Sequence, residues 1–407
     1  MDFESEARQI YSNAIKACLP ERTLKEALKG FSRPAGKLRL VAIGKAAWRM
    51  SKAALDELGT NLQGIVVTKD GHSEGPLGQL EIYEAGHPVP DSRSYAATEK
   101  SIELAKSLGS DDMLLLLISG GGSSLFEAPL LSSKATEDIT RIMLKSGIDI
   151  NEMNTIRKRL SAVKGGKFAA LCYPAKVCSF VLSDIPGNPL DQIASGPAYK
   201  DSTTAAQALE IAKKLGLPAE ALELIKRELP IELDNVSTKV IGSVDSLLRE
   251  AERQCQALGY KTLLLETYLG REAKELGYEF GAKAKTAVGA PLAIISGGEA
   301  SVHVKGRGKG GRAQETALAA AIAMRGARNC AFFSIASDGT DGFTEAAGGF
   351  VDGRTYELMS QSGVDPEQHL ENNDSYTALK AVGALLVTGP TGTNVNDLNV
   401  LLLRPED

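Results

Sequence analysis

The stretch MLLLLISGGGSSL, residues Met113 to Leu125, decides the fold. Its apolar start is too short to cross a membrane and is typical of a strand covered on both faces of a parallel sheet. The strand ends in three glycines set between serines, whose uncovered N–H groups and hydroxyls can form a nest for an oxyanion. Open α/β sheets bind ligands at the carboxyl ends of their strands, so we expect an anionic ligand here; a tight strand-to-helix turn is the alternative.

The composition sets the broad class. The chain has 407 residues, 43 % of them hydrophobic, enough for two or three domains that each bury a core. Only 5 % are aromatic and the net charge is −5, so we expect no nucleic-acid partner. Five scattered cysteines without a CxxC pair indicate a reduced, cytoplasmic protein. The acidic N-terminus is unlike a signal peptide and the apolar run from Ala317 to Met324 is too short to span a bilayer, so no membrane association is expected.

Alternating strand and helix patterns predict two α/β domains, residues 1–235 and 236–407, the first Rossmann-like with a largely parallel sheet. Ser92 or Ser94 is the expected cap of the helix that follows the PVPD turn. Strands are expected at 38–43, 64–68, 80–84, 113–118, 176–182, 261–265, 292–296, 302–304, 331–336 and 384–387. Helices are expected within 4–28, after Gly44, and at 95–108, 134–145, 150–162, 203–215, 219–228, 245–258, 271–288, 313–324 and 375–382.

Polar residues follow several of these strands. Lys45 lies at a strand-to-helix junction, where a helix N-terminus favours anions and a lysine adds a full charge, although a solvated lysine is equally consistent. Asp184, at the carboxyl end of another strand, is placed to hold a cation or accept a proton. The run from Asn154 to Lys167 gathers cations in an acidic chain, which leaves open a solvated helix face or an anion site.

The four histidines, which include His87, have no metal-ligand spacing and are expected to be structural. In the second half, four loops rich in glycine and polar residues follow strands: SGGE at 296–299, KGRGKGGRAQE at 305–315, SDGTDG at 337–342 and TGPTGTNVND at 388–397. We expect them to converge with the loops of the first half in a cleft between the domains. Gly306 to Gly311 is a formal GxGxxG, but its cations suit a polyphosphate better than a dinucleotide, and no Walker A sequence occurs.

A set of short motifs runs in order along nearly the whole chain. They are GKAA at 44, GHPVPD at 86, ISGGGSSL at 118, NxxRK at 154, KGGK at 164, LSDIPG at 182, IASGP at 193, ISGGE at 295, GGRAQE at 310, SDGTDG at 337 and TGPTGTNVNDL at 388. Together they resemble the class II glycerate kinases, whose C-terminal region is called MOFRL. The resemblance implies ATP- and Mg²⁺-dependent phosphorylation of D-glycerate to 2-phosphoglycerate. The family usually has Asn where this chain has Ala313.

The resemblance and the loop chemistry together imply direct phosphoryl transfer by a monomer or homodimer whose partners are a small-molecule substrate and a nucleotide. The catalytic candidates are Lys45, Arg312 and Asp184, and the metal candidates are Asp184, Glu299, Asp338 and Asp341. The binding candidates are Ser119, Gly120, Gly121, Gly122, Ser123, Ser124, Asn154, Lys164, Gly298, Gly310, Gly311 and Gln314.

Which carboxylate binds metal and which loop holds ATP stay open. Lys45 and Arg312, both in loops, are expected to contribute little to stability. Two other functions are weighed against the kinase: an NAD(P)H-dependent hydroxypyruvate reductase, for which the dinucleotide fingerprint is poor, and a non-catalytic sensor of sugar acids or nucleotides.

Overall fold

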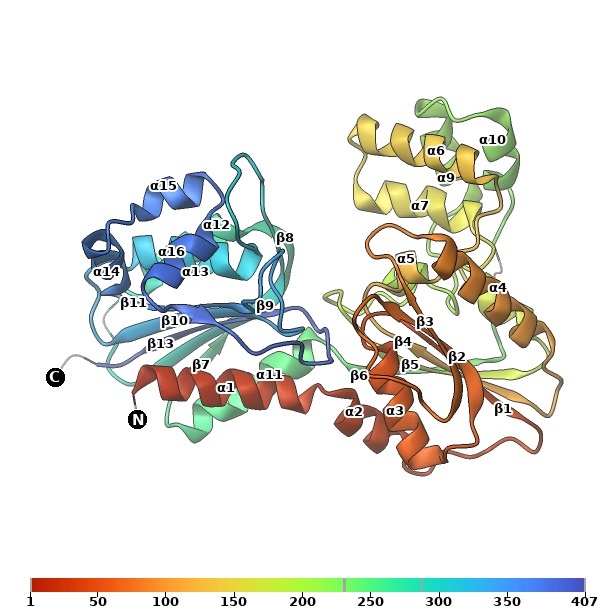
Figure 1. The fold of residues 1–407 in the computed structure, drawn as a ribbon, viewed down its shortest axis with the longest axis horizontal. Coiled ribbons are helices and arrows are strands. Elements are labelled where there is room, and N and C mark those ends of the chain that lie inside the picture. The colour runs from red at the N-terminus through yellow and green to blue at the C-terminus, as the bar shows by residue number, and fades with distance from the viewer. Residues whose placement is uncertain (1, 230–231, 287, 406–407) are drawn as a thin grey trace. The chain divides into compact units, whose positions relative to one another are not determined.

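The computed structural model describes residues 2–229, 232–286 and 288–405 (Figure 1). The chain divides into two compact units. We call Pro20–Leu182 with Asn188–Ile241 the parallel-sheet unit, and Met1–Leu19 with Ser183–Gly187 and Gly242–Asp407 the mixed-sheet unit. Within the described ranges, no helix has both the length and the apolar character needed to cross a membrane.

The parallel-sheet unit has a six-stranded sheet in the order β3-β2-β1-β4-β5-β6. β1 pairs in parallel with β2 and with β4, and the order reverses between β1 and β4, as in dinucleotide-binding folds. The predicted Rossmann-like sheet is therefore confirmed, although β6 was missed. The strands are β1 (Leu38–Ile43), β2 (Gln63–Lys69), β3 (Gln79–Ala85), β4 (Met113–Ile118), β5 (Lys176–Leu182) and β6 (Val236–Gly242).

The helices of this unit form two groups. α3 packs on β1 and β2, whereas α4 packs on β2 and β3. Helices α6, α7, α9 and α10 form a separate layer (Figure 1) with its own apolar core, which includes Ile139, Met143 and Ile156. The helices are α2 (Pro20–Leu28), α3 (Ala47–Leu58), α4 (Ser92–Lys106), α5 (Gly122–Leu125), α6 (Ser133–Ser146), α7 (Ile150–Leu160), α8 (Lys167–Leu171), α9 (Ala205–Lys214) and α10 (Ala219–Ile225), with a short 3₁₀ turn at Ile193–Ser195.

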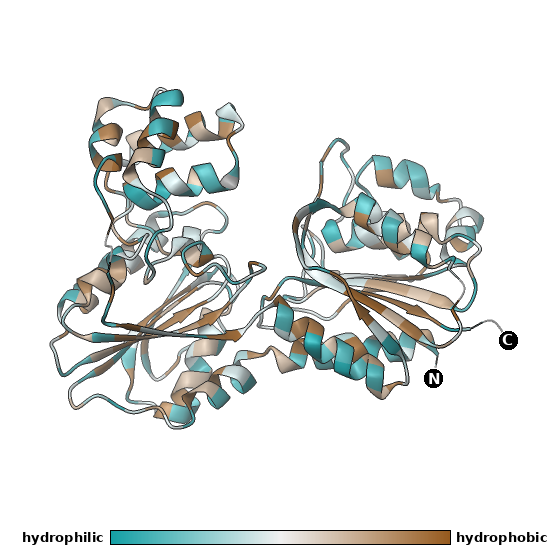
Figure 2. Ribbon diagram, turned by 180° about the vertical axis from the view of Figure 1, so that it is seen from behind, coloured by the Kyte–Doolittle hydropathy of each residue, from teal (hydrophilic) through white to brown (hydrophobic). Residues whose placement is uncertain are grey.

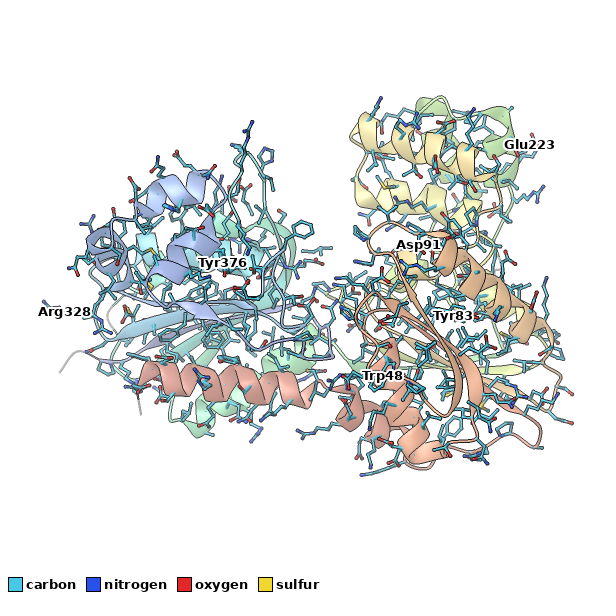
Figure 3. The ribbon with its side chains drawn as sticks, viewed as in Figure 1. Trp48, Tyr83, Asp91, Glu223, Arg328 and Tyr376 are labelled. Carbon is cyan, nitrogen blue, oxygen red and sulfur yellow. The ribbon has the colours of Figure 1, made fainter. Side chains whose placement is uncertain are left out.

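The N-terminus of α4 differs from the prediction. Asp91, labelled in Figure 3, is the N-cap, since its Oδ1 accepts the N–H groups of Arg93 at 2.9 Å and Ser94 at 3.1 Å. Ser94 Oγ accepts the Asp91 N–H at 3.0 Å and so completes a capping box. The expected cap at Ser92 or Ser94 is wrong because a carboxylate one position earlier reaches two N–H groups at once.

The mixed-sheet unit contains seven strands in the order β12-β11-β10-β13-β9-β7, with β8 also beside β9. β13 lies at the centre and pairs antiparallel with both β9 and β10. The sequence analysis missed β8, β11 and β13, although DLNVLLL has the apolar run of a buried strand. The strands are β7 (Lys261–Leu264), β8 (Tyr268–Glu272), β9 (Leu292–Ser301), β10 (Cys330–Ala336), β11 (Gly348–Asp352), β12 (Leu385–Leu386) and β13 (Asp397–Leu403).

Helices cover both faces of this second sheet. Figure 1 shows α1 and α11 on one face and α12, α13 and α16 on the other, and Figure 2 shows the apolar strands between them. The core includes Phe280 and Phe332, whose ring centroids are 4.9 Å apart. The helices are α1 (Phe3–Ala17), α11 (Val244–Ala257), α12 (Ala273–Lys283), α13 (Arg312–Ala323), α14 (Thr355–Gln361), α15 (Pro366–Glu371) and α16 (Ser375–Ala381). The predicted α/β class is confirmed for both units.

Two predictions about β9 are wrong. The strand runs to Ser301, so SGGE lies inside it and does not form a loop, and residues 302–304 have no regular structure. Gly298 has φ 150°, and a Cβ there would clash with the Tyr268 carbonyl. A Cβ on Gly297 would lie 2.8 Å from the Asp397 carbonyl. These glycines therefore let neighbouring strands approach, a reason that a glycine-rich sequence does not distinguish from a loop.

Candidate functional site

Two loops meet at the carboxyl ends of β1 and β4, where the strand order of the parallel sheet reverses. The Lys45 N–H donates to the Gly120 carbonyl at 2.8 Å. Ser119, fully buried, accepts the Ala46 N–H at 3.1 Å and donates its hydroxyl to the Ile43 carbonyl at 3.2 Å. Ser119 therefore fixes the two loops to each other, and the junction lies where an open α/β sheet binds its ligand.

The glycine loop presents a row of backbone donors. Gly121 has φ 85°, a left-handed conformation that glycine adopts without strain, and α5 begins directly after it. Among the described residues, the N–H groups of Gly120, Gly121, Gly122 and Ser123 have no protein acceptor. Successive N–H groups around a left-handed residue form a concave anion site, so the backbone here has the arrangement that the predicted nest requires.

Lys45 and His87 lie over this loop. A Cβ on Gly121 would lie 3.1 Å from His87 Nε2 and 3.3 Å from Lys45 Cγ. The pKa of His87 is lowered to about 4, first by burial and then by the charges of Lys45, Lys69 and His72. A neutral imidazole therefore faces the nest. The sequence analysis set His87 aside as structural, although it stands in the GHPVPD motif, which was the signal that could have marked it.

Side chains from two further segments, Lys164 and Ser195, hold the glycine loop in place. Lys164 Nζ donates to the Ser123 carbonyl at 2.7 Å and forms an ion pair with Glu127. The Ser123 hydroxyl shares a hydrogen bond of 3.0 Å with the Ser195 hydroxyl. Lys164 is 2 % exposed, so its ammonium holds the glycine loop in place and is already paired. Ser124 Oγ likewise donates back to the Gly121 carbonyl at 3.3 Å.

The IASGP segment carries backbone strain at this place. Ala194 and Ser195 have φ of 52° and 58°, conformations that cost a residue with a side chain about 1–3 kcal/mol. A Cβ on Gly122 would lie 2.6 Å from Ala194 Cβ. The Gly165 N–H donates to the Ser195 carbonyl at 3.1 Å and so joins the KGGK turn to the strained segment. Strain of this kind persists where surrounding bonds impose it, as at many ligand sites.

The cationic run on α7 has another role. Lys158 Nζ contacts Asp191 Oδ2 and Asp201 Oδ1 at 3.0 Å each, and Arg159 Nη1 contacts Asp201 Oδ2 at 2.9 Å. Lys158 is 2 % and Arg159 1 % exposed, so these charges form a buried ion network and not a solvated face. Asn154 lies in the middle of α7 and is half-buried. It therefore belongs to a helix, whereas the residues described above belong to loops.

In the mixed-sheet unit, Arg312 is the first residue of α13. Its Nε and Nη2 donate to the two oxygens of Asp397 at 2.6 and 3.0 Å, and its Nη1 donates to Glu299 Oε1 at 2.8 Å. Asp397 is 2 % exposed, and burial raises its pKa although the charge of Arg312 acts in the opposite direction. Asp397, which the sequence analysis did not single out, is thus the main partner of the predicted catalytic arginine.

Asp341 caps the same helix. Its Oδ2 accepts the Gln314 N–H at 2.8 Å and the Gln314 side-chain amide at 3.0 Å. Burial raises the pKa of Asp341 to about 7, and the nearby charge of Asp397 acts in the same direction. A Cβ on Gly311 would clash with this carboxylate, and one on Gly310 would clash with Ser375. Gly310, Gly311, Gln314 and Asp341 are therefore engaged with one another and with the chain around them.

Hydrogen bonds join the remaining strand-end loops of this unit. Thr391 donates its N–H to the Asp338 carbonyl at 3.1 Å, and Val395 donates its N–H to Ser337 Oγ at 2.9 Å. Asn396 Nδ2 donates to the Asp184 carbonyl at 2.6 Å. The structure thus brings Asp184 and the two loops at 337–342 and 388–397 to one end of the mixed sheet, and the carboxylates of Asp184 and Asp338 are both half-buried there.

The GxGxxG loop uses most of its backbone donors within the protein. The N–H groups of Lys305 and Gly306 donate to Asn373 Oδ1 at 2.8 and 2.9 Å. The N–H groups of Arg307 and Lys309 donate to Asn372 Oδ1 at 3.1 Å and Asp374 Oδ1 at 2.9 Å. Since these backbone donors are occupied, the part of the loop from Lys305 to Lys309 can offer a ligand only its exposed side chains.

One of those side chains, that of Lys309, packs against an aromatic ring. Lys309 Nζ lies 4.2 Å from the centroid of Tyr376, which Figure 3 labels. Lys380 Nζ donates to the hydroxyl of the same ring at 3.0 Å. Cation–π contacts of this kind restrict a lysine without neutralising it.

The donor chemistry available for a metal is limited but suitable. Within the described residues, no three side chains of His, Cys, Asp or Glu gather as a metal's ligands would. Mg²⁺ needs only one or two protein carboxylates because substrate phosphates supply further oxygens. Beside Asp184, the buried Oδ1 of Asn396 has no hydrogen-bond partner, so an acceptor oxygen remains for a hydrated cation.

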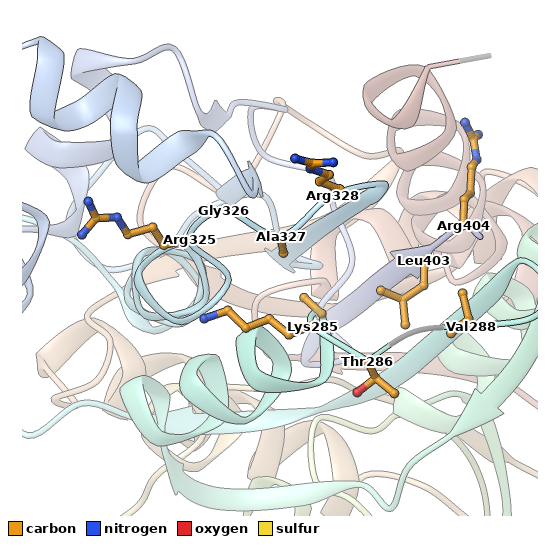
Figure 4. A pocket seen from close by; sticks show the side chains of 10 residues that line it. Lys285, Thr286, Val288, Arg325, Gly326, Ala327, Arg328, Leu403 and Arg404 are labelled. Atoms are coloured by element: carbon orange, nitrogen blue, oxygen red, sulfur yellow. The ribbon is translucent and has the colours of Figure 1, made fainter. Parts of the chain in front are cut away.

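A pocket of about 510 Å³ lies at the opposite end of the mixed sheet, where β13 ends and β10 begins. Figure 4 shows its basic side chains, whose charged ends are spread apart. None of the predicted site residues lines it. The charged residues of this pocket are Lys285, Arg325, Arg328 and Arg404.

Two family models match the chain. Residues 6–229 match a domain of unknown function, DUF4147, and residues 292–397 match the MOFRL family. A D-glycerate 2-kinase of Thermotoga maritima is 48 % identical over 98 % of this chain and 97 % of its own. A relative from Agrobacterium vitis, 38 % identical over 97 % of this chain and 93 % of its own, bears the name of a hydroxypyruvate reductase. The crystal structure of a glycerate kinase from Thermotoga maritima superposes with a TM-score of 0.92, at 48 % identity, over 98 % of this chain and 99 % of that one.

Proposed function

Since the chain belongs to the glycerate kinase family that carries the MOFRL region, we propose that it transfers the γ-phosphoryl group of ATP to D-glycerate and releases 2-phosphoglycerate. The observation that carries this proposal is the row of four uncommitted N–H groups from Gly120 to Ser123, beside Lys45 and a neutral His87. Oriented donors and one cation suit an anionic group of a substrate.

The division of roles follows from the place of each residue. Phosphoryl transfer needs positioning and charge neutralisation more than covalent chemistry. In the parallel-sheet unit, Lys45 supplies the cation next to the nest. In the mixed-sheet unit, Arg312 supplies oriented donors for an anionic group. Two sets of residues act as supports, because their polar groups or the space around them are occupied by the protein. Lys164 supports the nest, and Gly310, Gly311 and Gln314 support the start of α13.

Mg²⁺, when bound, supplies charge neutralisation of the phosphate oxygens, and Asp184 and Asp338 would hold it. Both residues are half-buried at one end of the mixed sheet. There the Asn396 amide donates to the backbone carbonyl of Asp184, and the buried side-chain oxygen of Asn396 has no hydrogen-bond partner in the protein. Asp341 is assigned to the cap of α13 instead, since its Oδ2 already accepts two hydrogen bonds from Gln314.

A reductase acting on hydroxypyruvate is the competing function, because one relative bears that name and the strand order is that of dinucleotide-binding sheets. In such sheets the glycine-rich turn follows the first strand. Here the turn after β1 is GKAA, with a single glycine, and the glycine-rich loop follows β4. The kinase is therefore favoured.

The deciding experiment is a pair of assays on the purified full chain. With ATP, Mg²⁺ and D-glycerate, product is detected by enolase coupling without added phosphoglycerate mutase. A signal that needs the mutase identifies the 3-isomer and contradicts the proposed regiochemistry. NADH or NADPH oxidation with hydroxypyruvate is measured alongside, and turnover in that assay alone replaces the kinase by the reductase.

A further inference from the structure

The guanidinium of Arg312 is held on two sides. The Nε and Nη2 atoms form a bidentate pair with Asp397, at 2.6 and 3.0 Å, and Nη1 donates to Glu299 at 2.8 Å. A guanidinium has five N–H donors, so with three in use two remain, one on each Nη atom. The side chain of Arg312 is 28 % exposed, so a ligand can reach part of it.

The two carboxylate partners differ in how firmly they are held. Asp397 is 2 % exposed, and its backbone lies in β13 between Gly298 of β9 and Ala336 of β10. The Glu299 side chain is 43 % exposed. Breaking a buried pair costs about 3–5 kcal/mol, because a charge is left without compensation, whereas a pair open to water contributes about 0.2–1 kcal/mol. Asp397 therefore stays in place, while Glu299 can turn to solvent at small cost.

The net charge of Arg312, Asp397 and Glu299 also favours the displacement of Glu299 by an anion. One arginine and two carboxylates sum to −1, which disfavours the approach of an anion. If Glu299 leaves, Arg312 and Asp397 are neutral together and three N–H groups face outward, oriented by the bidentate pair. A rigid fork held from behind is the arrangement that recognises carboxylate or phosphate oxygens.

We propose that Asp397 is the positioning residue that aims Arg312, and that Glu299 is a displaceable partner that occupies one N–H group of Nη1 until an anionic substrate takes its place. This inference rests on the proposed phosphoryl transfer and adds to it. It also separates the two acidic partners of one arginine into a fixed and an exchangeable one.

The first test is binding of inorganic phosphate to the full chain by calorimetry. Glu299→Gln should bind phosphate about fivefold more tightly than wild type, and the KM of one anionic substrate should fall by a similar factor. The matched control is Glu357→Gln, which removes the partner of Arg325, at 2.9 Å on the surface of the same unit, and should leave both values within twofold. If Glu299→Gln behaves as the control does, the displaceable role is overturned.

The second test asks whether Asp397 orients the guanidinium of Arg312. Asp397→Asn keeps the shape but loses the charge that grips Nε and Nη2, so kcat should fall at least 30-fold while each KM changes less than threefold. Asp397→Glu restores the charge on a longer side chain and should recover melting temperature more than kcat. A folded Asp397→Asn variant that keeps kcat within threefold of wild type overturns the positioning role. Should this variant not fold, the phosphate affinities of Glu299→Gln still decide the proposal.

The two proposals fail in different ways. Phosphate affinity is measured without ATP or D-glycerate, so its response to Glu299→Gln does not depend on turnover. A chain that shows the expected affinities but no kinase activity contradicts the proposed function alone. A chain with kinase activity and unchanged affinities contradicts this inference alone.

Discussion

The imidazole of His87 lies directly over the backbone of Gly121, so that a Cβ added there would be 3.1 Å from both Cδ2 and Nε2 of the ring. The GHPVPD turn after β3 thereby reaches the loop after β4, across β2 and β1 in the sheet order. Gly121 is the residue over which this histidine and Lys45 meet, and its missing side chain keeps the nest open.

Gly121→Ala should therefore impair both stability and activity. The φ of 85° costs a residue with a Cβ about 1 kcal/mol, and His87 must shift as well. We expect the melting temperature to fall by a few degrees and kcat/KM to fall by about 10²-fold, since the donors of the nest are displaced. Gly147→Ala is the matched control: φ is 71° at the end of α6, and nothing lies within 4 Å of the added Cβ. It should lose similar stability and keep its activity. Equal activities in the two variants would remove His87 and Gly121 from the site.

His87 should be neutral throughout the physiological range. Its pKa is lowered to about 4, first by burial and then by the charges of Lys45 and Lys69. The unfolded chain, with a histidine pKa near 6.5, binds more protons than the folded one between about pH 4 and 6.5. The stability that His87 contributes is thus present above about pH 6.5 and is lost on acidification through this window. NMR titration of the ring should place the transition near pH 4, and His87→Asn should melt with a shallower dependence on pH between 4.5 and 6.5. A ring that titrates near 6.5 contradicts the buried, cationic setting.

Replacement by Met should reduce the free energy of unfolding much more at Arg312 than at Lys45. The sequence analysis expected neither to matter for stability, but Arg312 neutralises the buried Asp397. Arg312→Met should cost about 3–5 kcal/mol of the free energy of unfolding, whereas Lys45→Met, at a half-buried loop position, should cost about 0.5–1 kcal/mol. Both should lower kcat by about 10²-fold. Thermal melting beside steady-state kinetics measures this. A Lys45→Met variant that melts normally and keeps more than about a tenth of wild-type kcat would make Lys45 a spectator.

The central strands of the parallel sheet were predictable because β1, β4 and β5 are rich in apolar residues and are followed by glycine or polar turn residues. Leu38–Ile43 and Lys176–Leu182 were predicted to the residue. The mixed sheet was harder because two of its strands carry polar or small residues inside the pattern. In β9 the glycines allow β8 and β13 to approach, so SGGE was taken for a loop. β11, GGFVD, begins with two glycines and has too few apolar residues to show a period.

The loop residues of the candidate site could be proposed from the sequence because their chemistry is local. The nest of Gly120–Ser123 and the place of Lys45 follow from glycines and a lysine next to strand ends. The partners of Arg312 and Asp341 are 85 and 27 residues away, so no spacing rule could identify them. The cations of α7 were ambiguous for the same reason, because their carboxylate partner Asp201 is 42 residues beyond Arg159.

Asp341 should make the stability of the mixed-sheet unit fall as the pH rises. Its pKa is raised to about 7, first by burial and then by the charge of Asp397, so between about pH 4 and 7 the folded state binds more protons than the unfolded state. The stability that this carboxyl contributes is present below about pH 4 and is lost as the pH rises through 7. Asp341→Asn keeps an oxygen that can accept both hydrogen bonds from Gln314 but has no charge to bury. Relative to wild type, the variant should therefore gain about 1–3 kcal/mol between pH 5 and 8. Urea unfolding at pH 5, 6, 7 and 8 measures this, with Asp111→Asn, an exposed carboxylate, as the control. Parallel pH profiles for Asp341→Asn and wild type would mean that Asp341 is charged in the folded protein over the whole range, and its role would then be an ionised cap of α13.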